Sequence, residues 1–179
     1  MKKDLAAMFE HFSRINKRSI MKFVGLGVLV IAIIFKVFVP PAGVSDIEGK
    51  ARIIDGDSLY VGGREVRLQG IDAPEGRQTC RRDGREWACG NAARNELAKM
   101  IAGREVACHG LDIDRHDRLL AVCRANGREL NREMVARGFA VSYGNYQTEE
   151  AEARRARLGV WAGEFDRPRD WRRQRNIGQ

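Results

Sequence analysis

The sequence contains no internal repeat and no low-complexity tract, which excludes a repeat array and a low-complexity disordered chain. Its strand-like and helix-like segments do not alternate regularly, so a parallel sheet of βαβ units is not indicated. Its four cysteines form no CxxC pair, and a zinc site is therefore a poor interpretation. A composition of 44% hydrophobic and 31% charged residues over 179 positions fits one globular domain with an appendage.

The positive charge is concentrated at the N-terminus. Of the formal net charge of +8, residues 1–45 carry 7 lysines and arginines against 2 acidic residues, and the other residues carry 25 against 22. The part expected to fold is therefore only mildly basic. Its bulk charge is weak evidence for nucleic-acid binding, and that argument depends on where individual arginines lie.

An apolar run spans residues 23–39 and is interrupted only by Lys36. Its length is at the short limit for a membrane span. Because basic residues precede the run, we expect residues 1–22 to be a cytoplasmic N-terminus and residues 23–39 to be a transmembrane signal-anchor in the inner membrane. Residues 40–50 would be a linker, and the domain that follows would be periplasmic or otherwise extracytoplasmic. The alternative is a cleaved signal peptide, which would release a secreted protein.

An even number of cysteines in an exported domain favours disulfides. Cys108 and Cys123 lie in two strand-like runs joined by a turn near residues 114–117. Antiparallel pairing through that turn would place them roughly opposite each other, and Cys80 and Cys89 would then close the loop between them. Four reduced, buried thiols become the better interpretation only if the domain is cytoplasmic.

Alternating and helical patterns predict several short strands and three helices. The strand-like runs cover residues 51–61, 64–71, 104–111 and 117–127. The helical patterns fall within residues 90–103, 128–140 and 148–161. Together they suggest an α+β domain over residues 51–163, built on a small barrel. The basic tail, residues 164–179, is expected to be loosely ordered.

Carboxylates interrupt the first two strand-like runs. Asp55 and Asp57 flank a glycine, and Asp72 and Glu75 flank Pro74, although Asp and Gly are poor strand formers. Hard cations such as Ca²⁺ prefer carboxylate and backbone carbonyl oxygens, so two such turns brought together would hold one. Each motif alone is more often an ordinary turn.

Three further charged residues in or near the strand-like runs suit phosphoryl transfer. Glu75 is spaced to hold or deprotonate a water beside the cation. Arg67, in the second run, and Arg118, at the start of the fourth, can converge on one cleft and neutralise the charge that develops on phosphate oxygens. Taken singly, each arginine is more simply a solvated surface residue.

The sequence resembles the staphylococcal-nuclease-like (thermonuclease) family in five segments that follow one another in order: "IIDGDS", "VRLQGIDAPE", "DRHDRLLAV", "LNREMVARGFA" and "EEAEARRARLGVW". The resemblance spans Ala51 to Trp161. It implies a five-stranded OB-fold barrel with about three flanking helices and Ca²⁺-dependent cleavage of DNA and RNA. It implies no protein partner.

The resemblance also implies a ligand set for Ca²⁺. Asp57 and Asp72 would ligate the ion, helped by the backbone carbonyl of Ala73. Asp55 and Ser58 would support these ligands from behind. The best-known member of the family has Thr where this chain has Ala73, a tolerable change if only the backbone oxygen is used.

The remaining roles implied by the resemblance concern the substrate. Glu75 would be the general base or would orient the attacking water. Arg67 and Arg118 would bind the scissile phosphate and stabilise its transition state. Tyr143 or Tyr146 would stack on the nucleotide or border it.

One departure from the family pattern lies beside Arg118. The turn before it usually contains Tyr-Gly and here contains His116-Asp117, which adds a carboxylate next to a phosphate-binding arginine. The alternative function is a non-catalytic OB-fold module that binds single strands. A non-catalytic relative would be expected to have lost at least one charged residue of the site, and here the set is complete.

Overall fold

The computed structural model describes residues 44–176. The predicted membrane segment, residues 23–39, lies outside them. Among the helices of residues 44–176, none is both long and apolar enough to span a bilayer. The topology across a membrane therefore stays a prediction.

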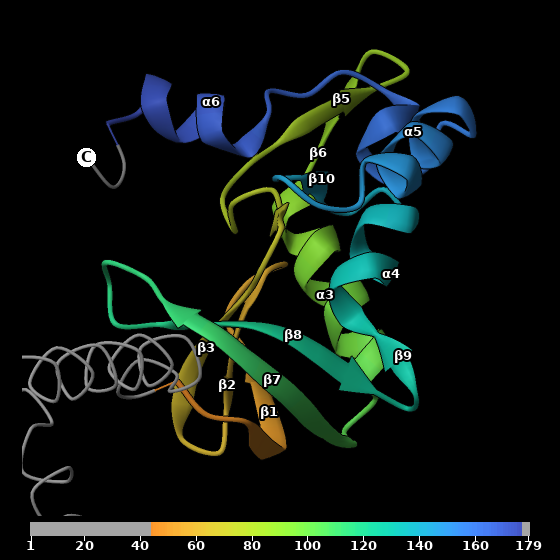
Figure 1. Ribbon diagram of the computed structural model, residues 1–179. Coiled ribbons are helices and arrows are strands. Elements are labelled where there is room, and N and C mark those ends of the chain that lie inside the picture. Colours follow the sequence, from red (N-terminus) through yellow and green to blue (C-terminus); the bar gives the residue numbers. More distant parts are fainter. Residues whose placement is uncertain (1–43, 177–179) are drawn as a thin grey trace, which may run out of the picture. The chain divides into compact units, whose positions relative to one another are not determined.

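Five strands form a closed β-barrel (Figure 1). They are β1 (Ile47–Ile53), β2 (Ser58–Val61), β3 (Arg64–Leu68), β7 (Glu105–Ile113) and β8 (Leu119–Ala125). Neighbours pair antiparallel in the order β3-β2-β1-β7-β8, and the parallel pairing of β3 with β8 closes the sheet on itself. The prediction of a five-stranded barrel is confirmed, and the architecture agrees with an OB-fold.

Alternation along the strands determines which side chains fill the barrel. Every second residue of β8 is buried, namely Leu119, Ala121, Cys123 and Ala125. Successive side chains of a strand point to opposite faces, so apolar residues with a period of two line the interior. Full burial of a side chain such as Leu119 contributes about 1.5–3 kcal/mol to folding.

Four α-helices flank the barrel in the described part of the chain, where three were predicted. They are α3 (Cys89–Ile101), α4 (Leu130–Ala136), α5 (Gln147–Arg155) and α6 (Pro168–Gln174), and a short 3₁₀ helix, η1, spans Gly159–Ala162. The first three lie in the predicted regions. α3 buries Ala93, Leu97 and Ile101, which are four residues apart and therefore share the face that packs into the core.

Short pairings extend the fold beyond the barrel. β4 (Ile71–Asp72) pairs with β10 (Val141–Ser142), β5 (Cys80–Arg82) forms a hairpin with β6 (Arg85–Trp87), and β9 (Arg128–Glu129) pairs with the end of β8. In the first of these pairs, Asp72 lies opposite Val141. The backbone at Asp72 is thus fixed by a ladder, although the strand is only two residues long.

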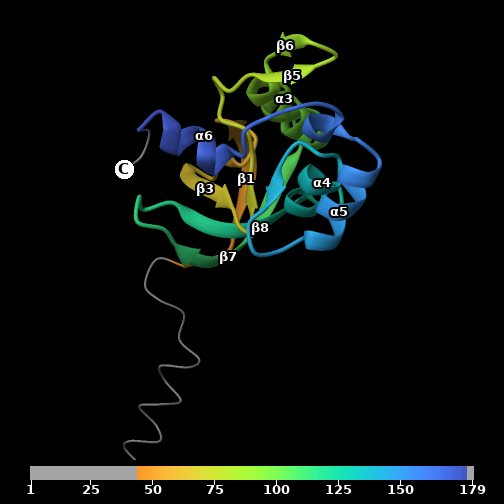
Figure 2. The ribbon, with the colours of Figure 1, turned by 90° about the horizontal axis from the view of Figure 1, so that it is seen from above.

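Two predicted boundaries differ from the structure. β1 begins at Ile47, inside the predicted linker 40–50, because residues 47–50 pair with β7. The tail 164–179, expected to be loosely ordered, contains α6, which lies over one end of the barrel (Figures 1 and 2). α6 is held by the buried side chains of Pro168 and Trp171. Two apolar residues in a basic segment give too little periodicity to predict a helix.

Both predicted disulfides are present. Cys108 and Cys123 are directly opposite in the β7–β8 ladder and form one of them, as the predicted strand register requires. Cys80 and Cys89 form the other, which joins the β5–β6 hairpin to the start of α3 and packs against Val160. No cysteine in residues 44–176 is free.

Candidate active site

The two acidic turns lie against each other beside α3. The first, between β1 and β2, contains Gly56, and a Cβ built on it would lie 2.7 Å from the Cβ of Ala73 and 2.8 Å from the Cβ of Ala93. Real side chains do not approach so closely. Glycine therefore allows the turn that precedes Asp57 to pack against the turn that follows Asp72.

The Asp57 carboxylate is buried and hydrogen-bonded. Its Oδ2 accepts from the backbone N–H of Ala73 at 2.8 Å, and its Oδ1 accepts from the hydroxyl of Ser58 at 3.0 Å. Asp55 accepts from the backbone N–H of Asp57 at 3.0 Å. Burial raises the pKa of Asp57 to about 7, because the attraction of Arg67 offsets only part of the cost of removing the charge from water. Asp55 and Ser58 thus fix the loop that carries Asp57.

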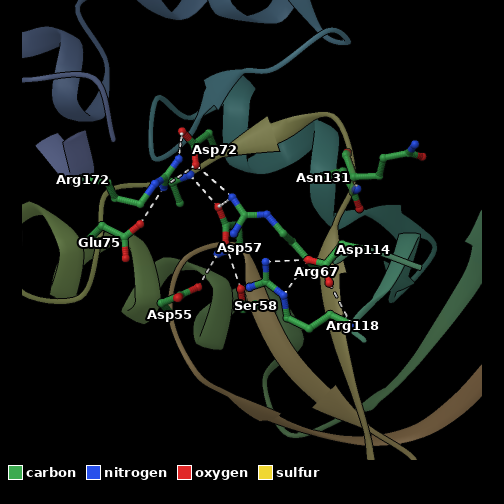
Figure 3. Close-up of polar contacts among 12 residues, drawn as sticks. Asp55, Asp57, Ser58, Arg67, Asp72, Glu75, Asp114, Arg118, Asn131 and Arg172 are labelled. Carbon is green, nitrogen blue, oxygen red and sulfur yellow. Dashed lines mark hydrogen bonds and ion pairs between the residues drawn. The ribbon is translucent and has the colours of Figure 1, made fainter. Parts of the chain in front are cut away.

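Arg67 on β3 lies between the two buried aspartates (Figure 3). Its Nη2 is 3.3 Å from Oδ2 of Asp57 and 3.0 Å from Oδ1 of Asp72. Burial lowers the pKa of Arg67, but the charges of Asp57 and Asp72 outweigh that effect and raise it above its ordinary value. Since one nitrogen reaches both carboxylates, their oxygens are close neighbours.

A further arginine, Arg172 on α6, joins the cluster and was not predicted. Its Nη1 is 2.9 Å from Oδ1 of Asp72 and 2.6 Å from Oε1 of Glu75, and its Nη2 is 3.0 Å from Oδ2 of Asp72. Burial lowers the pKa of Arg172, but its hydrogen bonds to Asp72 and Glu75 outweigh burial and raise it. The one feature of the sequence that could have indicated this is Trp171, since an aromatic residue within a basic tail suggests that the tail packs against the domain.

Arg118 is held by Asp114, at the other end of the turn between β7 and β8. Its Nε and Nη2 are 2.8 Å and 2.7 Å from Oδ2 of Asp114. Burial raises the pKa of Asp114, but hydrogen bonds from Arg118 and from the backbone N–H of His116 outweigh burial and hold it below its ordinary value. The carboxylate next to Arg118 is thus Asp114. Asp117, expected there from the sequence, has a left-handed backbone with φ of 62°.

Charged side chains around the two acidic turns line one pocket of about 630 Å³, whereas the buried Asp57 and Asp72 are not part of its lining. Its lining is Asp55, Glu65, Arg67, Glu75, Asp114, Arg115, His116, Arg118, Tyr143 and Arg172. Tyr143 is 61% exposed there. Tyr146 is not part of the lining: it packs against the core, and its hydroxyl donates to Glu129 at 2.9 Å. Of the two tyrosines predicted to contact a nucleotide, only Tyr143 lies at the pocket.

The two buried carboxylates beside the pocket, those of Asp57 and Asp72, suit a hard divalent cation. Asp57 and Asp72 are 3% and 2% exposed, and both reach the same nitrogen of Arg67. Adjacent carboxylate oxygens are what Ca²⁺ prefers. Residues 44–176 contain no group of three or more acidic, histidine or cysteine side chains arranged to hold a metal, and the oxygens of Asp72 are engaged by arginines.

Two buried side-chain amides, which no sequence pattern predicted, hold the loops around the site. The Gln78 Oε1 accepts from the backbone N–H of Glu75 at 3.2 Å, and its Nε2 donates to the carbonyl of Asp166 at 2.6 Å. Asn131, fully buried in α4, donates to the carbonyl of Gln69 at 2.9 Å. A lone amide has no periodic signal, so neither role was visible in the sequence.

Comparisons with known proteins agree with this architecture. Residues 65–163 match the model of a family described as staphylococcal nuclease homologue. A micrococcal nuclease from Shigella flexneri is 35% identical over 152 residues, which cover 72% of this chain and 82% of the relative. Protein ParB from Escherichia coli is 35% identical over 147 residues, covering 70% of this chain and 78% of the relative.

Other relatives are longer than the matched region. The succinoglycan biosynthesis protein ExoI from Rhizobium meliloti (strain 1021) is 33% identical over 123 residues, which cover 64% of each chain. The match covers only 30% of the probable staphylococcal-like nuclease CAN3 from Oryza sativa subsp. japonica. The chain thus spans less than two thirds of the length of these two relatives. With a family model matched over more than half of its residues, the chain belongs to the family of staphylococcal nuclease homologues.

Proposed function

We propose that this protein is a Ca²⁺-dependent nuclease that hydrolyses phosphodiester bonds of DNA and RNA. The observation that carries the proposal is the convergence of Arg67, Glu75 and Arg118 on one pocket beside two buried aspartates. Membership of the family and the relatives named as nucleases support it.

The residues in and beside the pocket would have different roles in phosphodiester hydrolysis. Arg67 and Arg118 would donate to the non-bridging phosphate oxygens and stabilise the negative charge that develops there. Glu75 would hold a water and accept its proton as the water oxygen bonds to phosphorus and the bond to the leaving oxygen breaks. A Ca²⁺ ion held by Asp57, Asp72 and the backbone carbonyl of Ala73 would supply Lewis-acid charge at the phosphate.

The positions of Asp114 and Asp55 suit this scheme. Asp114 restrains the Arg118 guanidinium through two short contacts, so that little side-chain entropy remains to be lost when a phosphate binds. Asp55 and Ser58 hold Asp57 from within its own loop. The binding geometry would thus be preorganised on both sides of the pocket.

Cleavage of a fluorescent oligonucleotide by the purified full chain tests the proposal. We expect cleavage in Ca²⁺, little in Mg²⁺, which demands stricter octahedral geometry, and none in chelator. Glu75→Gln should lower kcat by about 10²–10⁴-fold. Glu152→Gln, on the exposed face of α5 where Glu152 is 63% exposed, is the matched control and should retain full activity.

The same assay separates the enzyme from the non-catalytic alternative. A single-strand binding module needs a charged groove but no general base. Binding of the oligonucleotide without cleavage in any cation would favour the binding module. Full cleavage in chelator would contradict the metal assignment, and equal cleavage in Mg²⁺ would contradict the preference for Ca²⁺.

We also propose that residues 23–39 anchor the protein in the inner membrane with the nuclease domain on the extracytoplasmic side. The basic residues before this segment support that orientation, and the two disulfides support an oxidising compartment. Protease added to spheroplasts should degrade the domain. Protection until lysis would contradict export, and recovery of a shortened protein in the medium would favour cleavage and secretion.

A further inference from the structure

We infer that Arg172 is a further active-site arginine, whose guanidinium competes with the divalent cation for Asp72 and, once displaced, faces the substrate phosphate. This inference rests on the proposed function. It assigns a role to the C-terminal helix α6, which lies outside the region matched by the family model, residues 65–163.

The contacts of Arg172 are those of a strong, directional ion pair. Its two terminal nitrogens each contact one oxygen of Asp72, at 2.9 Å and 3.0 Å, and Nη1 also contacts Glu75 at 2.6 Å. Two parallel N–H···O bonds from a guanidinium to a carboxylate are stronger and more specific than a single contact. One side chain thereby bridges the proposed metal ligand and the proposed general base (Figure 3).

Asp72 cannot avoid this competition by turning away. Its residue is 2% exposed, and its backbone is fixed by the pairing of β4 with β10. Its Oδ1 also accepts from Arg67 at 3.0 Å. A divalent cation ligated by Asp72 must therefore use oxygens that Arg172 also contacts, and two positive groups at that separation repel each other strongly in a buried site.

The helix that carries Arg172 is anchored independently of this ion pair. Trp171 is buried, with 7% of the residue exposed, and Asp166 accepts through its carbonyl from the buried Gln78. Arg167 forms an ion pair with Glu150 on α5. These anchors keep α6 in place, so that competition moves the Arg172 side chain and not the helix.

A displaced Arg172 remains at the pocket. Its side chain is 25% exposed and already lines the pocket together with Arg67 and Arg118. A substrate phosphate bound in that pocket would be an anion within its reach. The exchange also releases the Glu75 Oε1 from its 2.6 Å contact with Arg172, so that this oxygen is available to a water.

Calcium titration calorimetry on the full chain tests the inference, with four proteins compared: wild type, Arg172→Gln, Arg172→Lys and Arg173→Gln. Arg172→Gln removes the competing charge and should bind Ca²⁺ at least fivefold more tightly than wild type. Arg172→Lys keeps the charge but loses the planar fork, so its affinity should fall between the two. Arg173, 71% exposed and paired with Asp170 on the same helix, is the matched control, and its variant should bind within twofold of wild type.

Thermal unfolding supplies a second measurement, because coupling between two ligands of one site is reciprocal. Arg172→Gln should lower the Tm in chelator, where Asp72 and Glu75 lose their shared partner, and should gain more from Ca²⁺ than wild type gains. Equal Ca²⁺ affinity in wild type and Arg172→Gln, or weaker binding by the variant, would overturn the inference while leaving the nuclease proposal intact. Failure of all four proteins to bind Ca²⁺ would overturn both.

Discussion

Gly90, the second residue of α3, lies directly against the carbonyl oxygen of Glu75: a Cβ built on residue 90 would be 1.8 Å from that oxygen. The backbone N–H of Gly90 donates to the carbonyl of Gln78 at 3.1 Å, and the backbone N–H of Gln78 donates to the carbonyl of Glu75 at 2.7 Å. The loop that carries Glu75 is therefore clamped against the start of α3. No side chain fits between them.

Gly90→Ala should therefore disturb both stability and catalysis. The added methyl group must push the Glu75 loop away from α3, which we expect to cost about 2–4 kcal/mol of unfolding free energy and to lower kcat at least tenfold. Denaturant unfolding and oligonucleotide cleavage measure the two effects. Gly76→Ala is the control, because a Cβ at residue 76 meets nothing within 4 Å. A similar loss of stability and of kcat in both variants would contradict the proposed effect of close packing between Gly90 and Glu75.

Arg118→Ala should lower kcat by about 10²–10⁴-fold while KM changes little, because the arginine would act on charge that develops in the transition state. Arg118→Lys should restore little of this, since lysine keeps the charge but loses the planar fork. Steady-state kinetics on a short oligonucleotide distinguish these outcomes. A change in KM alone would indicate that Arg118 contributes to substrate binding only. No change in kcat or KM would contradict any role for Arg118 in the reaction.

Asp117→Gly should stabilise the protein by about 1 kcal/mol. The backbone of Asp117 has φ of 62°, a left-handed conformation that glycine adopts without the steric cost of a Cβ. Because Asp114 and not Asp117 holds Arg118, we expect nuclease activity to change less than twofold. Asp117→Ala is the control for charge: it also removes the carboxylate but keeps the Cβ, so it should not be stabilising. Equal stabilisation by both variants would indicate a charge effect.

The pH dependence of stability in chelator should report on Asp57. Burial raises the pKa of Asp57 to about 7 from its ordinary value of 3.8, so the folded state holds the proton over a range where the unfolded state has lost it. The free energy of unfolding should therefore fall as pH rises from about 4 to about 7 and level off above that. Asp57→Asn should remove most of this slope and raise stability at pH 8 by on the order of 2 kcal/mol.

The effect of Ca²⁺ on the Tm tests whether the same residue is a metal ligand. At pH 8, Ca²⁺ should raise the Tm of wild type and have little effect on the Tm of Asp57→Asn, because the variant lacks one of the two buried carboxylates proposed to ligate the ion. Equal pH profiles for the two proteins in chelator would contradict the raised pKa. Equal stabilisation by Ca²⁺ would contradict the role of Asp57 as a ligand.

Much of the barrel could be predicted because its signals are local. The period-two alternation in β7 and β8, joined by a short turn, was enough to place Cys108 opposite Cys123. α4 falls within the predicted helical region 128–140, and its apolar residues at helical spacing, Leu130, Met134 and Val135, are all buried. Turn residues, strand alternation and helix spacing each involve residues only a few positions apart, so these patterns can be recognised directly in the sequence.

The partners of charged and amide side chains could not be predicted in the same way. Arg172 meets Asp72 across 100 positions of sequence, and Gln78 meets Asp166 across 88. Even within one turn, the choice of Asp114 over Asp117 as the partner of Arg118 depended on backbone conformation, because a positive φ at Asp117 accompanies a turn that leaves Asp114 facing the arginine. By itself the sequence determined most of the barrel strands, the disulfides and the acidic turns. Only the tertiary structure decided which arginine neutralises which carboxylate, since an ion pair depends on distance in space and carries no periodic pattern along the chain.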